Sequence, residues 1–237
     1  MNSIPKIIHQ IWGGKNPIPY YFLSLSNTWK EYHPDWQYEF WDDNRIDLFV
    51  QEFYPHYWEQ FKSFPQNMQR WDTVRYMILN KMGGIYVDFD AECIQPLDNL
   101  LKDTTCWFAL EPEEYAKENE KDPYLSTALM GSAPEHLFIQ TMIRNIFSYF
   151  RNERNSEFHK KIRNVIETTG PLMLTTTYEN FSDKSSIYLV PRKYIAAYTH
   201  SETVRILKGE ESDFLEKRIE EAYAVHYFFY SWMPEIK

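Results

Sequence analysis

The chain has 237 residues, of which 43% are hydrophobic and 25% charged, a composition that supplies a core for one α/β domain or for a domain with a small lid. Its net charge of −9 and the lack of a basic tract argue against a nucleic-acid partner. The apolar runs fall short of the roughly 20 residues that a membrane-spanning helix needs.

Hydrophobic spacing predicts strands and helices in alternation along the chain. The first part is predicted to contain strand 6–12, helix 20–32, strand 37–41, helices 44–53, 56–64 and 67–82, and strand 85–89. The second part is predicted to contain strands 105–110 and 126–131, helices 134–151 and 171–178, and strands 186–190 and 222–228. Such alternation is typical of an α/β sheet covered by helices. Residues 111–122 are dense in charge and lack a core-facing period, so we expect a mobile surface loop there.

The two cysteines and the N-terminus bear on the cellular compartment. Cys93 and Cys106 are too few for a disulfide framework and favour free thiols in a reducing environment. The first twelve residues lack the apolar segment of a signal peptide. We therefore expect a cytoplasmic protein without a membrane span. Peripheral association with an inner membrane through a partner is compatible with this expectation.

The stretch GGIYVDFD places two carboxylates at the end of an apolar strand. Side chains alternate along a strand, so Tyr86, Asp88 and Asp90 are predicted to share the face opposite to the core. Ligand crevices of open α/β sheets form at the carboxyl ends of strands. Two neighbouring anions repel unless a cation lies between them, and oxygen ligands suit Mg²⁺ or Mn²⁺. A solvated turn that carries two aspartates by coincidence is the alternative, because the short pattern by itself is common.

The helix predicted before this strand carries Arg70, Asp72 and Arg75 near one end. Asp72 and Arg75 are three residues apart and therefore lie on one helical face. One interpretation is an intrahelical ion pair at the surface, which contributes only a few tenths of a kcal/mol, roughly. The other is that Arg75 meets a phosphate, for which its planar guanidinium is suited, while Asp72 accepts hydrogen bonds from sugar hydroxyls.

Together these residues form a long composite motif that resembles a known family. Arg70-Trp71-Asp72, Arg75, Leu79, Gly83-Gly84, Tyr86, Asp88 and Asp90 resemble the DXD-containing sugar-binding region of glycosyltransferase family 32. That family includes the fungal initiating mannosyltransferase and bacterial capsule enzymes, and the spacing is shared with the glucosylating domains of large clostridial toxins. The resemblance covers roughly the first hundred residues and thins afterwards to short segments.

The resemblance implies a GT-A-like fold, that is, a Rossmann-like mixed sheet flanked by helices in a single domain over residues 1–237. It implies a donor-binding core at about 4–110, with the acceptor side and a C-terminal closing segment at 111–237. It also implies a metal-dependent retaining transferase that uses Mn²⁺ or Mg²⁺ and a nucleotide sugar. The acceptor would be a saccharide or a lipid-linked saccharide in polysaccharide or oligosaccharide synthesis. A UDP-sugar donor is slightly favoured, and GDP-mannose remains open.

The resemblance also assigns roles to individual residues. Asp72, Arg75, Asp88 and Asp90 form the expected catalytic set, and Asp88 and Asp90 are the expected metal ligands. His226, or the pair Ser231 and Trp232 behind it, would close the diphosphate site, with His226 as a third metal ligand; a satisfied core histidine is the alternative. Donor binding is expected at Trp12, which would stack on the nucleobase, and at Arg70, Asp72, Arg75, Gly84, Tyr86, Asp88, Gly170 and Trp232.

Two positions carry further expectations. Thr169-Gly170-Pro171 either starts a helix with Thr169 as its cap or presents a backbone amide to the donor. Thr127 stands where relatives commonly carry asparagine, which puts any sugar contact there in doubt. Two other functions remain as alternatives to the transferase: a sugar-binding module without turnover, and a phosphatase of the haloacid-dehalogenase type. Glu92 disfavours the phosphatase because threonine or valine usually stands at that place.

Overall fold

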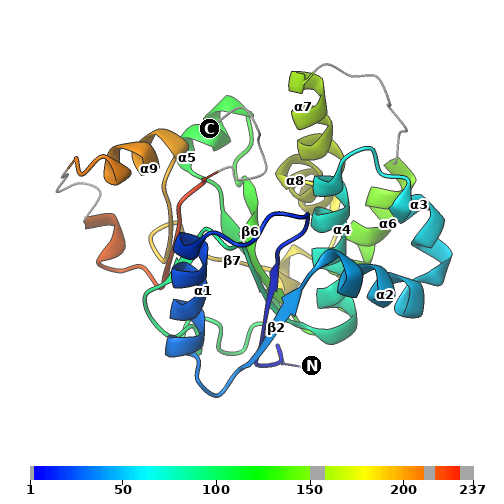
Figure 1. Cartoon of the computed structure of the whole chain (residues 1–237), viewed down its shortest axis with the longest axis horizontal. Coiled ribbons are helices and arrows are strands. Elements are labelled where there is room, and N and C mark those ends of the chain that lie inside the picture. The colour runs from blue at the N-terminus through cyan, green and yellow to red at the C-terminus, as the bar shows by residue number, and fades with distance from the viewer. Residues whose placement is uncertain (1–2, 150–157, 211–216, 230–237) are drawn as a thin grey trace.

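The computed structural model of the chain describes residues 3–149, 158–210 and 217–229 (Figure 1). Its helices are α1 (Tyr20–Tyr32), α2 (Asp43–Phe53), α3 (Trp58–Lys62), α4 (Asn67–Met82), α5 (Glu113–Glu118), α6 (Leu137–Tyr149), α7 (Phe158–Thr168), α8 (Pro171–Asn180) and α9 (His200–Leu207), with single 3₁₀ turns at Pro55–Tyr57 and Lys184–Ser186. Its strands are β1 (Ile7–Ile11), β2 (Gln37–Trp41), β3 (Gly84–Val87), β4 (Ala91–Cys93), β5 (Cys106–Leu110), β6 (Leu125–Ser132), β7 (Tyr188–Leu189), β8 (Ile195–Ala197) and β9 (Ala224–His226). Within these ranges no helix is both long and apolar enough to cross a membrane.

A mixed six-stranded sheet forms the centre of the fold. Its strand order is β2-β1-β3-β6-β5-β7. β1 lies parallel to β2 and β3, whereas β6 runs antiparallel to both β3 and β5. The carboxyl ends of β1 and β3 therefore lie at the same edge of the sheet, where α/β proteins commonly bind ligands.

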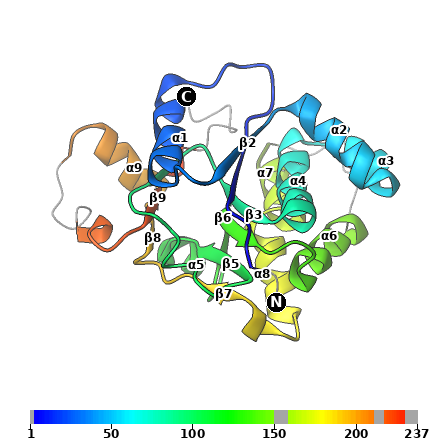
Figure 2. The ribbon, with the colours of Figure 1, turned by 90° about the horizontal axis from the view of Figure 1, so that it is seen from below.

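Alternating side chains build a separate core on each face of this sheet. On one face, Tyr86 and Phe108 pack with buried residues of α2, α4, α6 and α8. On the other face, Ile85, Val87 and Trp107 pack with Trp29 of α1 and with the smaller sheet. Figures 1 and 2 show these two groups of elements on opposite sides of the central strands. The alternation of β3 follows from the period of two in an extended chain.

A second sheet of three strands joins the segment after β3 to the C-terminal part of the described chain. Its order is β4-β9-β8, with β9 antiparallel to β4 and parallel to β8. Ala91 is paired with His226 in this register. This pairing places His226 beside the turn that follows β3. The closing segment, which comprises β9 and the residues up to Phe229, therefore reaches the carboxyl edge of the main sheet.

Two glycines shape the connection from α4 to β3. Gly83 and Gly84 have φ values of +68° and +100°, which L side chains rarely adopt. A Cβ on Gly84 would lie 2.6 Å from the carbonyl oxygen of Ile7, and one on Gly83 would lie 2.6 Å from Pro134. The glycine pair therefore ends the helix and lets β3 pair closely with β1.

The predicted element pattern is confirmed in most of its parts. The helix at 20–32, the strand at 37–41 and the helix at 67–82 have the predicted bounds. The strand predicted at 85–89 instead spans Gly84–Val87, because the chain turns at the next residues. The end of the helix predicted at 134–151 lies outside the described residues. The sequence patterns missed β4, β8 and α9, since short elements have too few residues for a clear period, and they also missed the longer helix α7.

The prediction of a loop without regular structure at 111–122 is wrong. The segment contains the helix α5, in which Ala116 is buried and the neighbouring charged residues are exposed. Glu111 is also buried, with only 5% of its surface exposed. A helix of six residues with a single buried position is too short to produce an amphipathic period, so the density of charge concealed it.

Candidate functional site

A cavity of about 570 Å³ lies at the carboxyl edge of the main sheet. Residues that follow β1 and β3 form part of its lining, and residues of α4, α5 and the closing segment form other parts. The lining includes Ile11, Trp12, Gly13, Gly14, Trp71, Asp72, Arg75, Tyr86, Asp88, Phe89, Asp90, Glu111, Tyr115, Glu118, Asn119, Thr127, Gly170, His226 and Phe228. Its size and mixture of rings and charged groups suit a nucleotide-sized ligand.

The two aspartates of GGIYVDFD lie in a turn between β3 and β4. β3 ends at Val87, and the N–H of Ala91 donates to the carbonyl oxygen of Asp88 at 3.1 Å. Phe89 between them packs against Phe22 and Leu25 of α1. Because this aromatic side chain anchors the turn, both carboxylates face the cavity, as predicted, although the strand does not extend to them.

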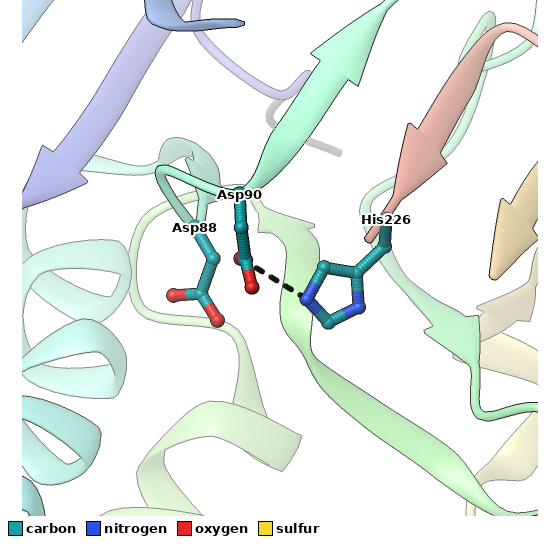
Figure 3. A group of neighbouring side chains, drawn as sticks. All are labelled: Asp88, Asp90 and His226. Atoms are coloured by element: carbon teal, nitrogen blue, oxygen red, sulfur yellow. Dashed lines mark hydrogen bonds and ion pairs between the residues drawn. The ribbon is translucent and has the colours of Figure 1, made fainter. Parts of the chain in front are cut away.

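His226 completes a cluster with these carboxylates. One ligand atom each of Asp88, Asp90 and His226 lies within 4.8 Å of the other two. His226 Nε2 is 3.2 Å from Asp90 Oδ1, and the three side chains converge in Figure 3. Two carboxylates and one imidazole form a donor set that suits Mn²⁺, and carboxylate oxygens also suit Mg²⁺. The predicted metal residues are therefore brought together by the fold.

The pKa values of the cluster reflect its mutual electrostatics. Desolvation, reinforced by the charge of Asp90, raises the pKa of Asp88 despite the attraction of Arg75. Burial alone would raise the pKa of Asp90, but His226 and the N–H of Phe229 outweigh it and leave that pKa below its ordinary value. Burial lowers the pKa of His226, but Asp90 and Asp88 outweigh burial and raise it overall. The raised pKa of His226 therefore reflects the two carboxylates beside it, whose negative charge a bound cation would also offset.

Asp72 and Arg75 form a buried ion pair, so the interpretation as a surface pair is wrong. Both side chains are 3% exposed, and Arg75 Nη2 lies 3.0 Å from Asp72 Oδ1 and 3.5 Å from Asp88 Oδ1. Arg75 Nη1 donates to the carbonyl oxygen of Thr127 at 3.0 Å. The hydroxyl of Tyr86 donates to Asp88 Oδ1, and the Arg75 guanidinium lies over the Tyr86 ring at 4.7 Å. The helix therefore delivers a fixed cation next to the aspartate turn.

Thr169 binds Asp72 and does not cap a helix. Its hydroxyl donates to Asp72 Oδ2 at 2.9 Å, whereas Gly170 is the residue that precedes α8, with Pro171 at the first helical position. Burial, opposed by Arg75 and this hydrogen bond, raises the pKa of Asp72 to about 6. Gly170 lines the cavity at the start of α8, which agrees with the alternative that its backbone faces a ligand.

Trp12 and Trp71 supply rings to the cavity lining. Trp12 packs against Phe22 and Phe89 with ring centroids 5.5 Å apart in each case, and its indole N–H donates to the carbonyl oxygen of Asn16 at 2.8 Å. Trp71 was not predicted as a separate site residue. Its ring occupies the space above Gly13, where a Cβ would lie 2.1 Å from the indole.

Asp43 connects these parts and was missed by the sequence analysis. One carboxylate oxygen accepts from the indole N–H of Trp71 and the other accepts from the N–H of Gly14, both at 2.8 Å. Asp43 lies at the start of α2, 28 residues from Trp71 and 29 residues from Gly14. From the sequence alone it appears only as an acidic residue in the first turn of a helix. The fold alone reveals this link.

Two predicted donor-binding residues in the described part of the chain, Arg70 and Gly84, do not line the cavity. Arg70 pairs with Asp47 and lies over the ring of Phe61, away from the lining. Gly84 contacts the backbone of Ile7 and shapes the start of β3. Trp232 and its neighbour Ser231 lie outside the described residues.

Glu111 is a cavity residue that the sequence analysis did not single out. It directly follows β5, and its residue surface is 5% exposed. Burial raises the pKa of Glu111 to about 7, and the nearby charges of Asp88 and Asp90 add to this, against the attraction of His226 and a hydrogen bond from Ser126. A charged residue directly after a buried strand was the available signal, as it was for Asp88.

Sequence comparisons agree with this site. A family profile described as "Glycosyltransferase sugar-binding region containing DXD motif" matches residues 19–107. The chain is 32% identical over 179 residues to inositol phosphoceramide mannosyltransferase 1 of Schizosaccharomyces pombe, covering 74% of this chain and 51% of that protein. It is 33% identical over 112 residues to the initiation-specific alpha-1,6-mannosyltransferase of Saccharomyces cerevisiae, covering 44% of this chain and 23% of that protein. The chain thus spans about half or less of the length of these fungal relatives.

Structural comparisons support the fold. The glycosyltransferase domain of the YGT toxin aligns with a TM-score of 0.56 at 9% identity, covering 80% of each chain. The PaToxG glycosyltransferase aligns with a TM-score of 0.54 at 14% identity, covering 94% of this chain and 90% of the other. The mixed sheet flanked by helices is therefore GT-A-like, as predicted. With its DXD turn, matching profile and related sequences, the chain belongs to the glycosyltransferase family that carries the DXD-containing sugar-binding region.

Proposed function

We propose that the protein is a metal-dependent transferase that moves a hexose, with mannose favoured, from a nucleotide sugar to a hydroxyl of a saccharide or lipid-linked acceptor. The observation that carries this proposal is the cluster of Asp88, Asp90 and His226 beside the buried Arg75 in one cavity. Mannose is favoured over the glucose-type sugars because the related fungal proteins are named as mannosyltransferases. GDP-mannose is accordingly the first donor to test, ahead of the UDP-sugars that the sequence analysis slightly favoured.

The cluster residues would hold the cation and the donor diphosphate. Asp88, Asp90 and His226 would bind Mn²⁺ or Mg²⁺, which when bound supplies positive charge for the diphosphate leaving group. Arg75 is pre-positioned by Thr127 and Asp88, so its guanidinium needs little reorganisation to bind phosphate oxygens. Such fixed charges stabilise a leaving anion more than flexible ones do.

Other residues would orient the donor. Asp72, held by Thr169, would accept hydrogen bonds from sugar hydroxyls. Trp12 would stack on the nucleobase, and Gly170 would approach the donor through its backbone. Retention of the anomeric configuration is part of the proposal on the strength of the family resemblance. The proposed location is the cytoplasm or a cytoplasmic membrane surface where a lipid-linked acceptor is accessible.

The deciding experiment is a panel of sugar nucleotides assayed for release of nucleoside diphosphate. GDP-mannose, UDP-glucose, UDP-galactose and UDP-N-acetylglucosamine are each incubated with the protein and Mn²⁺, and again with a chelator. The proposal expects that nucleoside diphosphate is released from one donor and that the chelator abolishes this release. Release of inorganic phosphate would indicate a phosphatase, and binding without any release would indicate a sugar-binding module. Proton NMR of the transferred sugar then reports the anomeric configuration.

A further inference from the structure

We propose that the Glu111 carboxylate binds the acceptor by accepting a hydrogen bond from one of its hydroxyls, an assignment that rests on the transferase function proposed above. The ligand class is a neutral polyol, that is, a sugar or a cyclitol. This makes Glu111 the deep contact of an acceptor subsite, whose outer part is formed by α5.

The backbone of Glu111 is fixed on both sides. Its N–H donates to the carbonyl oxygen of Tyr124 at 2.9 Å, and its own carbonyl oxygen accepts from Arg192 Nε at 2.9 Å. The residue follows directly on β5, which is paired with β6 and β7. A side chain on such a support keeps its position, which is what a substrate-binding group requires.

The carboxylate of Glu111 is buried, and the charged group that attracts it is the imidazole of His226. Ser126 favours its ionised form as well, and across residues 3–149, 158–210 and 217–229 no lysine or arginine forms an ion pair with it. The side chain of Arg192 is directed to the backbone carbonyl oxygen of Glu111 and to Asp122. Buried carboxylates usually have a compensating cation or several donors, so one that lines a cavity and has no lysine or arginine partner has room for a ligand donor.

The position of Glu111 excludes two other roles. It is not part of the cluster of Asp88, Asp90 and His226, whose ligand atoms lie within 4.8 Å of one another. A carboxylate repels the phosphates of a donor, so binding to the diphosphate is excluded on charge. A neutral hydroxyl is the remaining partner that a sugar substrate offers, and an anionic carboxylate accepts a stronger hydrogen bond from it than a neutral group does.

The acceptor is favoured over the donor because Glu111 begins a path to solvent. Tyr115, Asn119 and Glu118 line the same cavity; the first two are half-buried and Glu118 is exposed. Among these cavity-lining residues, exposure therefore increases from the buried Glu111 through Tyr115 to Glu118. A molecule that enters from solvent can place one hydroxyl at Glu111 while its remainder lies against α5.

The test compares transfer with hydrolysis in Glu111→Gln, which keeps the shape of the side chain. The donor is GDP-mannose with Mn²⁺, and the acceptor probes are inositol phosphoceramide in detergent micelles and methyl α-mannopyranoside. We expect the ratio of transfer to donor hydrolysis to fall about 10- to 100-fold, the size of a lost hydrogen bond to a charged group. The KM for the acceptor should rise while the KM for GDP-mannose is retained. Glu113→Gln, an exposed change on the same segment, should leave the ratio as in the wild type.

Each outcome decides one of the two proposals. Wild-type protein that turns over no sugar nucleotide would overturn the proposed function and this assignment with it. Wild-type hydrolysis without transfer to either probe would overturn the acceptor assignment alone. An unchanged ratio in Glu111→Gln, or a raised KM for GDP-mannose with an unchanged KM for the acceptor, would also overturn it and place Glu111 outside the subsite or on the donor. If Glu111→Gln folds poorly, Glu111→Asp keeps the charge, retracts it by one methylene and is expected to raise the acceptor KM.

Discussion

His226 Nε2 lies 3.2 Å from Asp90 Oδ1, although the two residues are 136 positions apart in the sequence. The pairing of β4 with β9 creates this contact, because it sets Ala91 opposite His226 in the register. Asp90 also accepts a hydrogen bond from the N–H of Phe229 at 3.0 Å. The segment that contains His226 and Phe229 is thus tied to the DXD turn through the Asp90 carboxylate, and the cluster of Asp88, Asp90 and His226 forms only when β9 pairs with β4.

Replacing Asp90 by asparagine should abolish metal-dependent turnover. The change removes one negative ligand but keeps a carbonyl oxygen for the N–H of Phe229, so the fold should persist. We expect a loss of at least about 100-fold in kcat/KM and a weaker thermal stabilisation by Mn²⁺. Asp98→Asn, which alters an exposed carboxylate paired with Lys6, is the control. Undiminished turnover in Asp90→Asn would remove Asp90 from the metal site.

Replacing Arg75 by lysine should separate its charge from its geometry. Lysine retains the positive charge but cannot bind Thr127, Asp72 and Asp88 with one planar group. We expect kcat/KM to fall about 100-fold or more. Unfolding in urea should show a stability loss of about 1–3 kcal/mol from the imperfectly paired buried carboxylates.

Arg163→Lys is the matched control for that variant, because Arg163 forms an exposed pair with Glu167 on α7. Its activity and stability should remain those of the wild type, since exposed ion pairs contribute little. Equal behaviour of the two variants would show that the Arg75 guanidinium has no special function.

Replacing Asp43 by asparagine should weaken donor binding more than catalysis. The indole N–H of Trp71 and the N–H of Gly14 contact different oxygens of Asp43, and in asparagine one of these positions is an NH2 group, which cannot accept a hydrogen bond. The cavity wall at Gly13 and Gly14 should loosen as a result. We expect about a tenfold rise in the KM of the donor with a smaller change in kcat, corresponding to one lost hydrogen bond. A fall in kcat with an unchanged KM would contradict this positioning role.

Glu111→Gln should stabilise the metal-free protein at high pH. Burial raises the pKa of Glu111 from 4.5 to about 7, so the folded state holds its proton more tightly than the unfolded state. The wild type therefore loses stability from this group as pH rises from about 4.5 through 7, and the loss is complete above 7. Urea unfolding in the presence of a chelator should give equal stabilities below pH 4.5 and a difference of up to about 3 kcal/mol at pH 8. A wild type that is the more stable protein at pH 8 would contradict the raised pKa.

The local motif was readable from the sequence because its signals are short-range. Periodic apolar residues gave the bounds of α4, and the glycine pair marked its end. The apolar run that follows predicted β3 and its two carboxylates. These features depend on backbone preferences and on the alternation of side chains, which neighbouring residues fix among themselves.

Partnerships between distant residues needed the folded chain. The burial of Asp72 with Arg75, the link from Asp43 to Trp71, the place of Glu111 in the cavity and the contact between Asp90 and His226 all depend on which segments pack together. An ion pair between Asp72 and Arg75 would contribute little if it were exposed to water. Because both side chains are buried, the pair instead fixes the guanidinium of Arg75 beside Asp72 and Asp88. The sequence shows which of these side chains carry a charge. The strength of their interactions depends on the exclusion of water and on the register of strand pairing, and both arise only when strands far apart in the chain pair with each other.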